Sequence, residues 1–386
     1  MTSEQATEAA VDYQGDNFDV DVIVIGAGAA GVGLGVVLGQ LGVPRYGILE
    51  RYEVGASFRR WPKEMRFITP SFPSNSFGVL DLNAVAVGTS PGFSLDSEHP
   101  AGAAYAAYLE RVAEYFEQPI TTGVEVHAVT PLPEGGFDLE TTNGPVRSGF
   151  VVWAGGEFQN PVLGGFPGAD LCVHNSSVVS FAELPGDEAY VIGGYESGID
   201  AATALWLQGK RVTLFDARAR WSNESSDPSI SLSPYTKERL QTAQRGGRIE
   251  LVGETRIARV SQDEAGFTLE AEDGRSWRSA TRPILATGFR QVAAQHPELW
   301  NWREDGLPEL SEHDESTRTP GLFLVGPGVR HEEISFCFIY KFRQRFAVVA
   351  AEIGRRMGLD LSYLEFFRKN QMWLDDLSCC TADCVC

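Results

Sequence analysis

The sequence has 386 residues, 43% of them hydrophobic, and a net charge of −20. A chain of this length is too long for one ordinary core, so two domains are expected. The negative charge argues against nucleic acid or an anionic membrane surface as the main partner, because both would repel it. Six cysteines in so long a chain are not a disulfide scaffold.

The N-terminal segment, residues 1–17, is polar and acidic and lacks the basic and apolar regions of a signal peptide. We expect a disordered tail there. No stretch approaches the roughly 18 unbroken apolar residues that a membrane span needs. These features predict a cytoplasmic protein with no membrane partner.

Residues 21–50 have the pattern of a strand, a tight turn, a helix and a second strand. The apolar, β-branched residues 22–25 lead into Gly26, Gly28 and Gly31, which are spaced as GxGxxG. Gly26 permits the turn, Gly28 lets the backbone approach a pyrophosphate, and Gly31 lets the helix lie close to the strand. Residues 46–49 end on Glu50, whose carboxylate can accept both hydroxyls of a ribose. We predict a dinucleotide-binding unit; a plain structural turn is the alternative.

The following segments are expected to build a pocket and the rest of the sheet. Residues 67–97 form a long loop rich in Ser, Pro, Phe and Gly, and we expect it to line a flavin or substrate pocket, with a surface loop as the alternative. Residues 99–117 have apolar residues at helical spacing, which predicts an amphipathic helix. Residues 124–153 are typical of short strands that end at an Ala-Gly-Gly turn, residues 154–156.

The chain then repeats this plan. Residues 190–192 predict a strand, residues 193–198 a second glycine turn, residues 199–208 a helix, and residues 212–215 a strand that ends on Asp216. A second meander follows, and residues 286–288 echo the earlier turn. Residues 321–326 predict a returning strand and residues 334–355 a closing helix. We therefore predict an α/β fold of two Rossmann-like domains, the second inserted in the first, each with a small antiparallel meander.

This nested arrangement resembles the two-dinucleotide-binding-domain flavoproteins, which include the flavin-containing monooxygenases and the pyridine nucleotide-disulfide oxidoreductases. The resemblance implies an FAD-binding domain of residues 18–163 and 289–372, and an NAD(P)-binding domain of residues 164–288 that takes NADH or NADPH. It implies an FAD- and NAD(P)H-dependent oxidoreductase. The cofactor-binding residues that it implies are Gly26, Gly28, Gly31, Glu50, Arg51, Ser57, Phe58, Trp61, Val126, Ala154, Gly155 and Gly326, with Gly193, Gly198 and Asp216 at the nicotinamide nucleotide.

Several segments near the expected flavin indicate which branch of the superfamily the chain resembles. Residues 55–59 are similar to the GGTWR segment of flavin-containing monooxygenases, and residues 166–174 to their FxGxxxH signature, with two extra residues before His174. The core has no CxxC or CxxxxC dithiol, only the lone Cys172 and Cys337. The usual Gly-Asp near the C-terminus is replaced by Gly326-Pro327-Gly328. We expect monooxygenase-like transfer of electrons to oxygen and an organic substrate. The chain is also similar to bacillithiol-disulfide-reductase-like flavoproteins.

The second nucleotide site departs from its pattern. Tyr195 takes the place of the middle glycine, where a side chain would point towards the pyrophosphate. Asp216 favours NADH, whereas Arg218 and Arg220 can meet the 2′-phosphate of NADPH. A decayed unit kept for its fold is the alternative.

The C-terminal tail, residues 373–386, is rich in cysteine. Four thiols within eight residues can bind a soft metal ion or pass electrons from a flavin. These residues are Cys379, Cys380, Cys384 and Cys386. We expect a catalytic or metal-binding tail that folds onto the flavin pocket of its own or a partner subunit, as in a homodimer. Reduction of a thiol or soft-metal substrate, a non-enzymatic redox or metal sensor, and a merely tolerated terminus are the alternatives.

Other candidates lie just before and within the expected closing helix. His331 is expected beside the flavin ring as an acid or base. Phe338, Phe342 and Phe346 fall on one helical stripe and are expected in the core. The neighbouring basic residues Lys341, Arg343 and Arg345 suit either an anionic partner or a solvated helical face.

Overall fold

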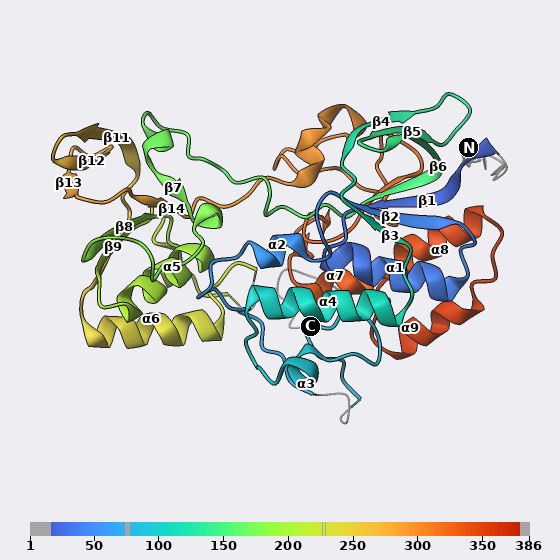
Figure 1. Ribbon diagram of the computed structural model, residues 1–386, viewed down its shortest axis with the longest axis horizontal. Helices are drawn as coiled ribbons and strands as arrows, with labels where there is room; N and C mark the ends of the chain where they lie inside the picture. The colour runs from blue at the N-terminus through green and yellow to red at the C-terminus, as the bar shows by residue number, and fades with distance from the viewer. Residues whose placement is uncertain (1–16, 74–77, 226, 228, 379–386) are drawn as a thin grey trace, which may run out of the picture.

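The computed structural model describes residues 17–73, 78–225, 227 and 229–378. It has two halves that lie side by side (Figure 1), each built around its own sheet and its own hydrophobic core. The predicted N-terminal tail, up to residue 16, lies outside the described residues. Within the described ranges, no helix is long and apolar enough to cross a membrane.

The first half contains a seven-stranded sheet with the order β3-β2-β1-β6-β5-β4, and β15 also pairs with β6. β6 joins two parts of this sheet: its first residues pair with β5 in the antiparallel meander, and its last residues pair in parallel with β1 and β15. The strands are β1 (Val20–Ile25), β2 (Tyr46–Glu50), β3 (Ile120–Thr122), β4 (Val126–Pro131), β5 (Phe137–Thr141), β6 (Gly144–Trp153) and β15 (Leu322–Leu324).

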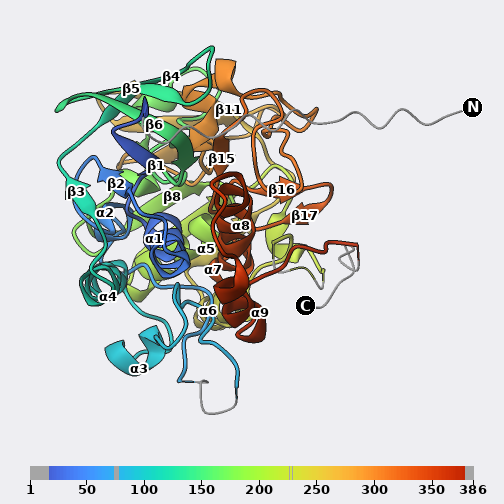
Figure 2. The same ribbon diagram turned by 90° about the vertical axis from the view of Figure 1, so that its right-hand side faces the viewer.

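Helices pack on this sheet around α1 (Ala29–Leu41), which is buried along almost its whole length. α1 packs against α8 (Phe346–Arg356) and α4 (Gly102–Tyr115), and Figure 2 shows these helices below the strands. The shorter helices are α2 (Ala56–Arg59), α3 (Pro91–Leu95), α7 (Ile339–Phe342) and α9 (Glu365–Lys369). The helix predicted over residues 99–117 is α4.

The second half lies in sequence between β6 and β15, so it is inserted in the first. Its sheet is parallel, with the order β10-β9-β8-β14-β7. These strands are β7 (Val173–His174), β8 (Glu188–Ile192), β9 (Arg211–Phe215), β10 (Ile249–Val252) and β14 (Ile284–Leu285). The helices α5 (Glu196–Leu207) and α6 (Pro234–Gly246) and the meander β11 (Ile257–Asp263), β12 (Gly266–Ala271) and β13 (Ser276–Ser279) complete it. The predicted fold class is confirmed; the exact domain boundaries stay a prediction.

Two antiparallel links join the halves. Residues 157–163 leave the first half and residues 288–292 return to it. Val162 N donates to Gly288 O at 2.9 Å, and Arg290 N donates to Asn160 O at 2.8 Å. Elsewhere the Glu64 carboxylate accepts from the backbone N–H groups of residues 181 and 182, at 2.9 and 3.2 Å. These contacts fix how the halves face each other.

The helix predicted over residues 334–355 is wrong at its start and is interrupted. Residues 330–335 form a hairpin of β16 (Arg330–His331) and β17 (Ile334–Ser335), and a 3-10 turn separates α7 from α8. Arg343 and Arg345 lie at this break and are buried, so a solvated face is wrong for both. Arg343 donates to Ala84 O at 2.9 Å, and Arg345 reaches Asp314. Such distant partners leave no trace in helical periodicity.

Arg345 and Asp314 form a fully buried ion pair. The Asp314 carboxylate accepts from Arg345 Nη2 at 2.8 Å and from Arg345 Nε at 3.0 Å, and both side chains have no exposed surface. His331 Nε2 lies 2.5 Å from the same carboxylate. Arg345 also donates to Glu312 O and Leu374 O, so this pair ties the closing helix to two distant segments.

Replacing Asp314 with Asn should lower the free energy of unfolding by about 3–5 kcal/mol, because the buried guanidinium loses its counter-charge. Asn tolerates the left-handed backbone of this position, where φ is 63°, so the backbone itself should not add strain. Chemical denaturation measures the change. Asp305→Asn, at an exposed pair with Arg303, is the control and should keep the wild-type midpoint. A wild-type midpoint for Asp314→Asn would contradict the importance of the buried pair.

Candidate cofactor site

The turn between β1 and α1 is tightly packed where Gly31 meets Gly26 and open to unfilled space at Gly28. A Cβ atom at Gly31 would lie 1.9 Å from Gly26 O, so only glycine lets α1 start this close to β1. Gly26 has a φ of 106°, which also favours glycine. A Cβ at Gly28 would meet nothing within 4 Å. The free N–H groups of α1 therefore face open space, as a phosphate cradle requires.

Glu50 holds this turn and keeps acceptor capacity for a ligand. Its Oε2 accepts from Ala27 N at 2.8 Å and its Oε1 from Tyr52 N at 2.9 Å. A carboxylate has about four acceptor positions, so two backbone donors leave room for ribose hydroxyls. This geometry fits the ribose role expected for Glu50.

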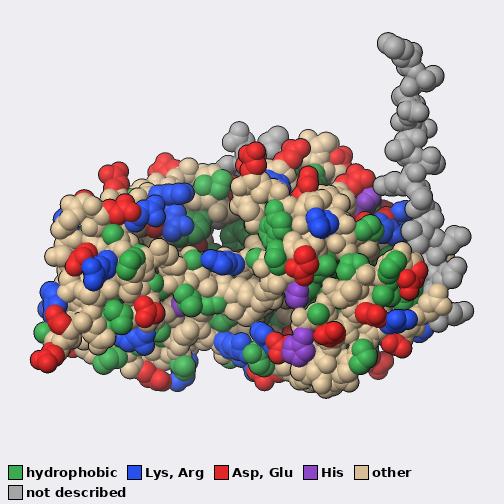
Figure 3. All heavy atoms as spheres, turned by 90° about the horizontal axis from the view of Figure 1, so that it is seen from above, with side chains coloured by type: hydrophobic (Ala, Val, Ile, Leu, Met, Phe, Trp, Pro, Cys, Tyr) green, Lys and Arg blue, Asp and Glu red, His purple; other side chains and the backbone are tan. Residues whose placement is uncertain are grey.

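A cavity of about 470 Å³ extends from this turn to the boundary between the halves. The first half contributes Gly28 and Glu50, and the second contributes Glu196, Ser197 and Asp200 near the start of α5. Figure 3 shows the surface hollowed between the halves. The volume lies in the usual range of small-molecule sites. A chamber shared by both units is where two cofactors could meet.

One wall of the cavity is aromatic. Phe58, Trp61 and Phe67 have ring centroids 5.0 to 5.6 Å apart. Phe67 begins the long loop predicted to line a pocket, and Ile68, Thr69 and Asn83 of this loop also line the cavity. An apolar wall of this kind excludes water and offers a surface to a flat ring system.

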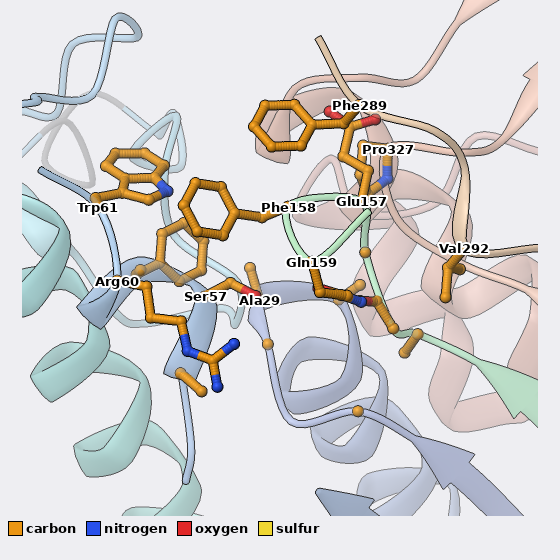
Figure 4. Close-up of a pocket in the computed structure, with 18 of the residues that line it drawn as sticks. Ala29, Ser57, Arg60, Trp61, Glu157, Phe158, Gln159, Phe289, Val292 and Pro327 are labelled. Atoms are coloured by element: carbon orange, nitrogen blue, oxygen red, sulfur yellow. The ribbon is translucent and has the colours of Figure 1, made fainter. Parts of the chain in front are cut away.

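The opposite wall contains a carboxyl group, Glu157 (Figure 4). Phe158, Phe289 and Pro327 also line this part of the cavity. Burial raises the pKa of Glu157 to about 7. Its side-chain partner is the neutral amide of Gln291, whose Nε2 lies 3.5 Å away.

The second glycine turn repeats the first with one difference. A Cβ at Gly198 would lie 1.7 Å from Gly193 O, the same close approach as in the first unit. Tyr195 stands at the N-cap of α5, the position of Gly28 in α1. Its hydroxyl donates to Ser231 O at 3.0 Å, and the Arg220 guanidinium lies over its ring at 5.6 Å.

Asp216 is fully engaged, unlike Glu50. Its Oδ1 accepts from the backbone N–H groups of Arg218 and Arg220, at 2.8 and 3.2 Å. Its Oδ2 accepts from Gly194 N at 2.8 Å and from the Arg220 guanidinium at 3.2 Å. These hydrogen bonds lower the pKa of Asp216, although burial opposes them. A ribose hydroxyl would have to displace Arg220 before it could bind this carboxylate.

The cavity brings together most residues expected to bind FAD. The lining includes Gly26, Gly28, Glu50, Arg51, Ser57, Phe58, Trp61, Val126, Ala154 and Gly155. Gly31 packs on Gly26, and Gly326 lies close to Ala30, while its neighbour Pro327 lines the cavity. Gly193, Gly198 and Asp216 form the second turn and do not line this cavity. Neither does His331, which is bound to Asp314, so its acid–base role stays a prediction.

The two core cysteines have different surroundings. Cys172 is buried, and burial raises the pKa of its thiol to about 11. Cys337 is exposed and lines the cavity, and its Sγ lies 3.1 Å from Ser229 Oγ. Cys379, Cys380, Cys384 and Cys386 lie outside the described residues. Within the described part of the chain, no group of three or more His, Cys, Asp or Glu side chains could hold a metal ion.

Arg60 and Glu157 are two of the lining residues that the sequence analysis did not name as site residues. The Arg60 guanidinium lies 3.9 Å from the Tyr52 ring centroid, and both residues line the cavity. Arg60 had a signal, because it directly follows the GGTWR-like segment. Glu157 had a similar signal, because it directly follows the predicted Ala-Gly-Gly turn, but its burial depends on links that meet only in the folded chain.

Comparison with known proteins identifies the family. The model of the family described as pyridine nucleotide-disulphide oxidoreductase matches residues 23–326. The chain belongs to this family. It is an oxidoreductase that uses FAD and NAD(P)H.

Two relatives are similar in sequence over part of their length. Ferredoxin–NADP reductase of Lacticaseibacillus paracasei is 26% identical over 242 residues, which span 60% of this chain and 69% of that protein. Bacilliredoxin reductase Bdr of Bacillus subtilis is 23% identical over 228 residues, 57% of this chain and 66% of that protein.

Several solved structures share the fold of this chain. Bacillithiol disulfide reductase Bdr of Staphylococcus aureus has a TM-score of 0.71 at 19% identity, over 87% of this chain and 98% of that chain. A flavin-containing monooxygenase of Stenotrophomonas maltophilia has a TM-score of 0.66 at 17% identity, over 88% and 98%. Both branches considered from the sequence are therefore among the structural neighbours.

Gly28→Val should keep the stability of the cofactor-free protein but weaken FAD binding at least about tenfold. The Gly28 backbone, with φ of −81° and ψ of −167°, is open to valine, and the side chain would enter the space that a pyrophosphate needs. Flavin fluorescence titration and thermal unfolding measure the two effects. Gly31→Ala is the contrasting variant, because its Cβ strikes Gly26 O and should destabilise the apoprotein. Wild-type FAD affinity in Gly28→Val would contradict the cradle.

Proposed function

We propose that this chain transfers hydride from NADPH to FAD and passes the electrons to a small acceptor that enters the cavity. The observation that carries this proposal is the single chamber that joins the Gly28 turn to the start of α5. As acceptor we propose oxygen together with an organic substrate. In support, the described cavity lining has only one thiol, Cys337, and thus no dithiol to relay electrons.

The residues present fit FAD, which supplies two-electron chemistry when bound. Gly28 and the α1 N-terminus would hold its pyrophosphate, and Glu50 its ribose. The aromatic wall of Phe58, Trp61 and Phe67 would shield the reacting rings from water. The two antiparallel links would hold the halves in a fixed relative position. The protein would then position the two cofactors and exclude water from the cavity.

The hydrogen bonds between Arg220 and Asp216 favour NADPH over NADH. Arg220 already covers this carboxylate, and Arg218 beside it is exposed. A 2′-phosphate would bind these guanidinium groups, whereas a 2′-hydroxyl would first have to break their contact with Asp216.

Arg220→Ala should raise the NADPH concentration needed for half-maximal flavin reduction at least about tenfold and should change the NADH value less. The variant loses the phosphate partner and frees one acceptor position on Asp216 Oδ2, which still accepts from Gly194 N, for a hydroxyl. Anaerobic titration of the FAD-loaded protein, followed by loss of flavin absorbance, measures both. Arg245→Ala, on the exposed side of α6, is the control. Reduction of the wild type at lower NADH than NADPH concentration would contradict this choice.

A second candidate function is reduction of a disulfide or a soft metal ion. Cys337 is a thiol at the cavity, and the tail carries four more. The sequence similarity to a bacilliredoxin reductase supports this reading, with two electrons reducing one disulfide to two thiols. The tail would then act as a thiol or metal delivery arm.

Replacing the four tail cysteines with serine, and separately Cys337→Ser, should lower NADPH oxidation at least about tenfold with disulfide or soft-metal acceptors if this second function holds. The oxygen-dependent rate, measured with peroxide release, should not change. Unchanged turnover with every acceptor in both variants would end the second candidate. Negligible turnover of the wild type with all acceptors would instead support a flavin-bearing sensor.

A homodimer and a cytoplasmic location stay predictions.

A further inference from the structure

Glu157 lies where the cavity meets the two links between the halves. It directly follows the Ala-Gly-Gly turn at the end of β6, and this turn packs on the first glycine turn: a Cβ at Gly26 would lie 2.9 Å from Ala154 O. Its amide partner, Gln291, belongs to the returning link. The carboxyl group therefore sits beside the FAD cradle and on the boundary with the nucleotide-binding half, where hydride would be exchanged.

The surroundings of Glu157 favour the neutral form of its carboxyl group and supply no ion pair to its carboxylate. Phe158 and Phe289, stacked with ring centroids 5.4 Å apart, line the cavity with it, and Figure 4 shows Phe289 and Pro327 at its side. Gln291 offers a single long contact. Burial raises the pKa of this carboxyl group to about 7, so it carries a proton in acidic solution and lines a cavity to which it can give that proton.

Within the described residues, no titratable group packed around Glu157 forms a hydrogen bond or ion pair with its carboxyl group, whose side-chain partner is Gln291. His174 stacks edge-on against the Phe289 ring and accepts from Ser176 N at 3.2 Å. His296 packs on Trp153 and lies 3.6 Å from Glu298. Arg290, next to Gln291, is exposed. Of the charged residues that line the rest of the cavity, Glu196 and Asp200 are bonded within the second half, to Thr236 and Arg239 respectively.

We propose that Glu157 is the acid–base group of this cavity and donates the proton that accompanies two-electron transfer from nicotinamide to flavin. The inference rests on the proposed function. When bound, the flavin would supply two-electron chemistry, and its neutral reduced form would contain one proton more than a hydride delivers. The Glu157 carboxylic acid would give this proton, become a carboxylate, and regain a proton from solvent.

The proton balance sets the direction of the pH dependence. Glu157 must be protonated to act, and its pKa is about 7. The rate of flavin reduction should therefore be highest below about pH 7 and fall as the pH rises through this value. A residue that only supports the fold would not impose this profile.

The test is single-turnover bleaching of the FAD-loaded protein by NADPH, followed from about pH 5.5 to about pH 9. Glu157→Gln should slow bleaching about 100-fold at the acid end and remove the pH dependence, because the amide cannot give up a proton. Gln has the shape of the protonated side chain, so this variant should fold. Glu157→Asp should be slower than the wild type but keep a pH dependence. Glu298→Gln, at an exposed carboxyl group in the 3-10 turn Pro297–Leu299 that follows the returning link, is the control and should behave as the wild type.

A second measurement does not need flavin. The infrared difference spectrum between flavin-free wild type and Glu157→Gln should contain a carboxylic acid C=O band that disappears near pH 7; Glu298→Gln should retain it. A band lost near the ordinary value of about 4.3, or bleaching of Glu157→Gln within about twofold of the wild type, would overturn the proposal. A protein that stays colourless with FAD would defeat the proposed function as well, whereas a yellow Glu157→Gln protein reduced at the wild-type rate would defeat this inference alone.

Discussion

The close contact between α1 and β1 is the constraint on which the rest of the site depends. With 1.9 Å between Gly26 O and a Cβ at Gly31, any other residue at position 31 would push the helix away from the strand. Because the helix starts at the sheet, its unpaired N–H groups are aimed at the space above the carboxyl ends of β1 and β6. Gly28 keeps that space open, and Glu50 braces the turn from β2 through Ala27 N.

The second unit uses the same contact for a different task. Gly198 and Gly193 approach as closely as their counterparts, so the strand–turn–helix geometry is retained. Its nucleotide-facing details have diverged, because Tyr195 fills the place of the middle glycine and Arg220 covers Asp216. Both units line the cavity, and the two antiparallel links and the Glu64 contacts join the halves beside it. Glu157 lies on one of those links and lines the cavity, where the proposed proton transfer would take place.

Much of this could be predicted from the sequence, and the limits have physical causes. The glycine spacings, the β-branched runs and the terminal acids depend on local geometry, so they predicted both βαβ units, and most of the FAD-binding residues implied by the resemblance line the cavity. The closing helix was mispredicted because Arg343 and Arg345 bond to segments far away in sequence. Glu157 was missed because its pKa depends on burial by Phe158, Phe289 and the returning link. The saturation of Asp216 by Arg220 is likewise a tertiary contact, although both residues were recognised as candidates.

The most direct test of the central claim, that the first turn cradles a flavin, is the visible absorption spectrum of the protein after incubation with FAD and removal of free FAD by gel filtration. The account predicts a yellow protein that retains about one FAD per chain, because each chain has one β1–α1 turn to hold the FAD pyrophosphate. A colourless protein that retains no FAD, while remaining folded, would contradict it.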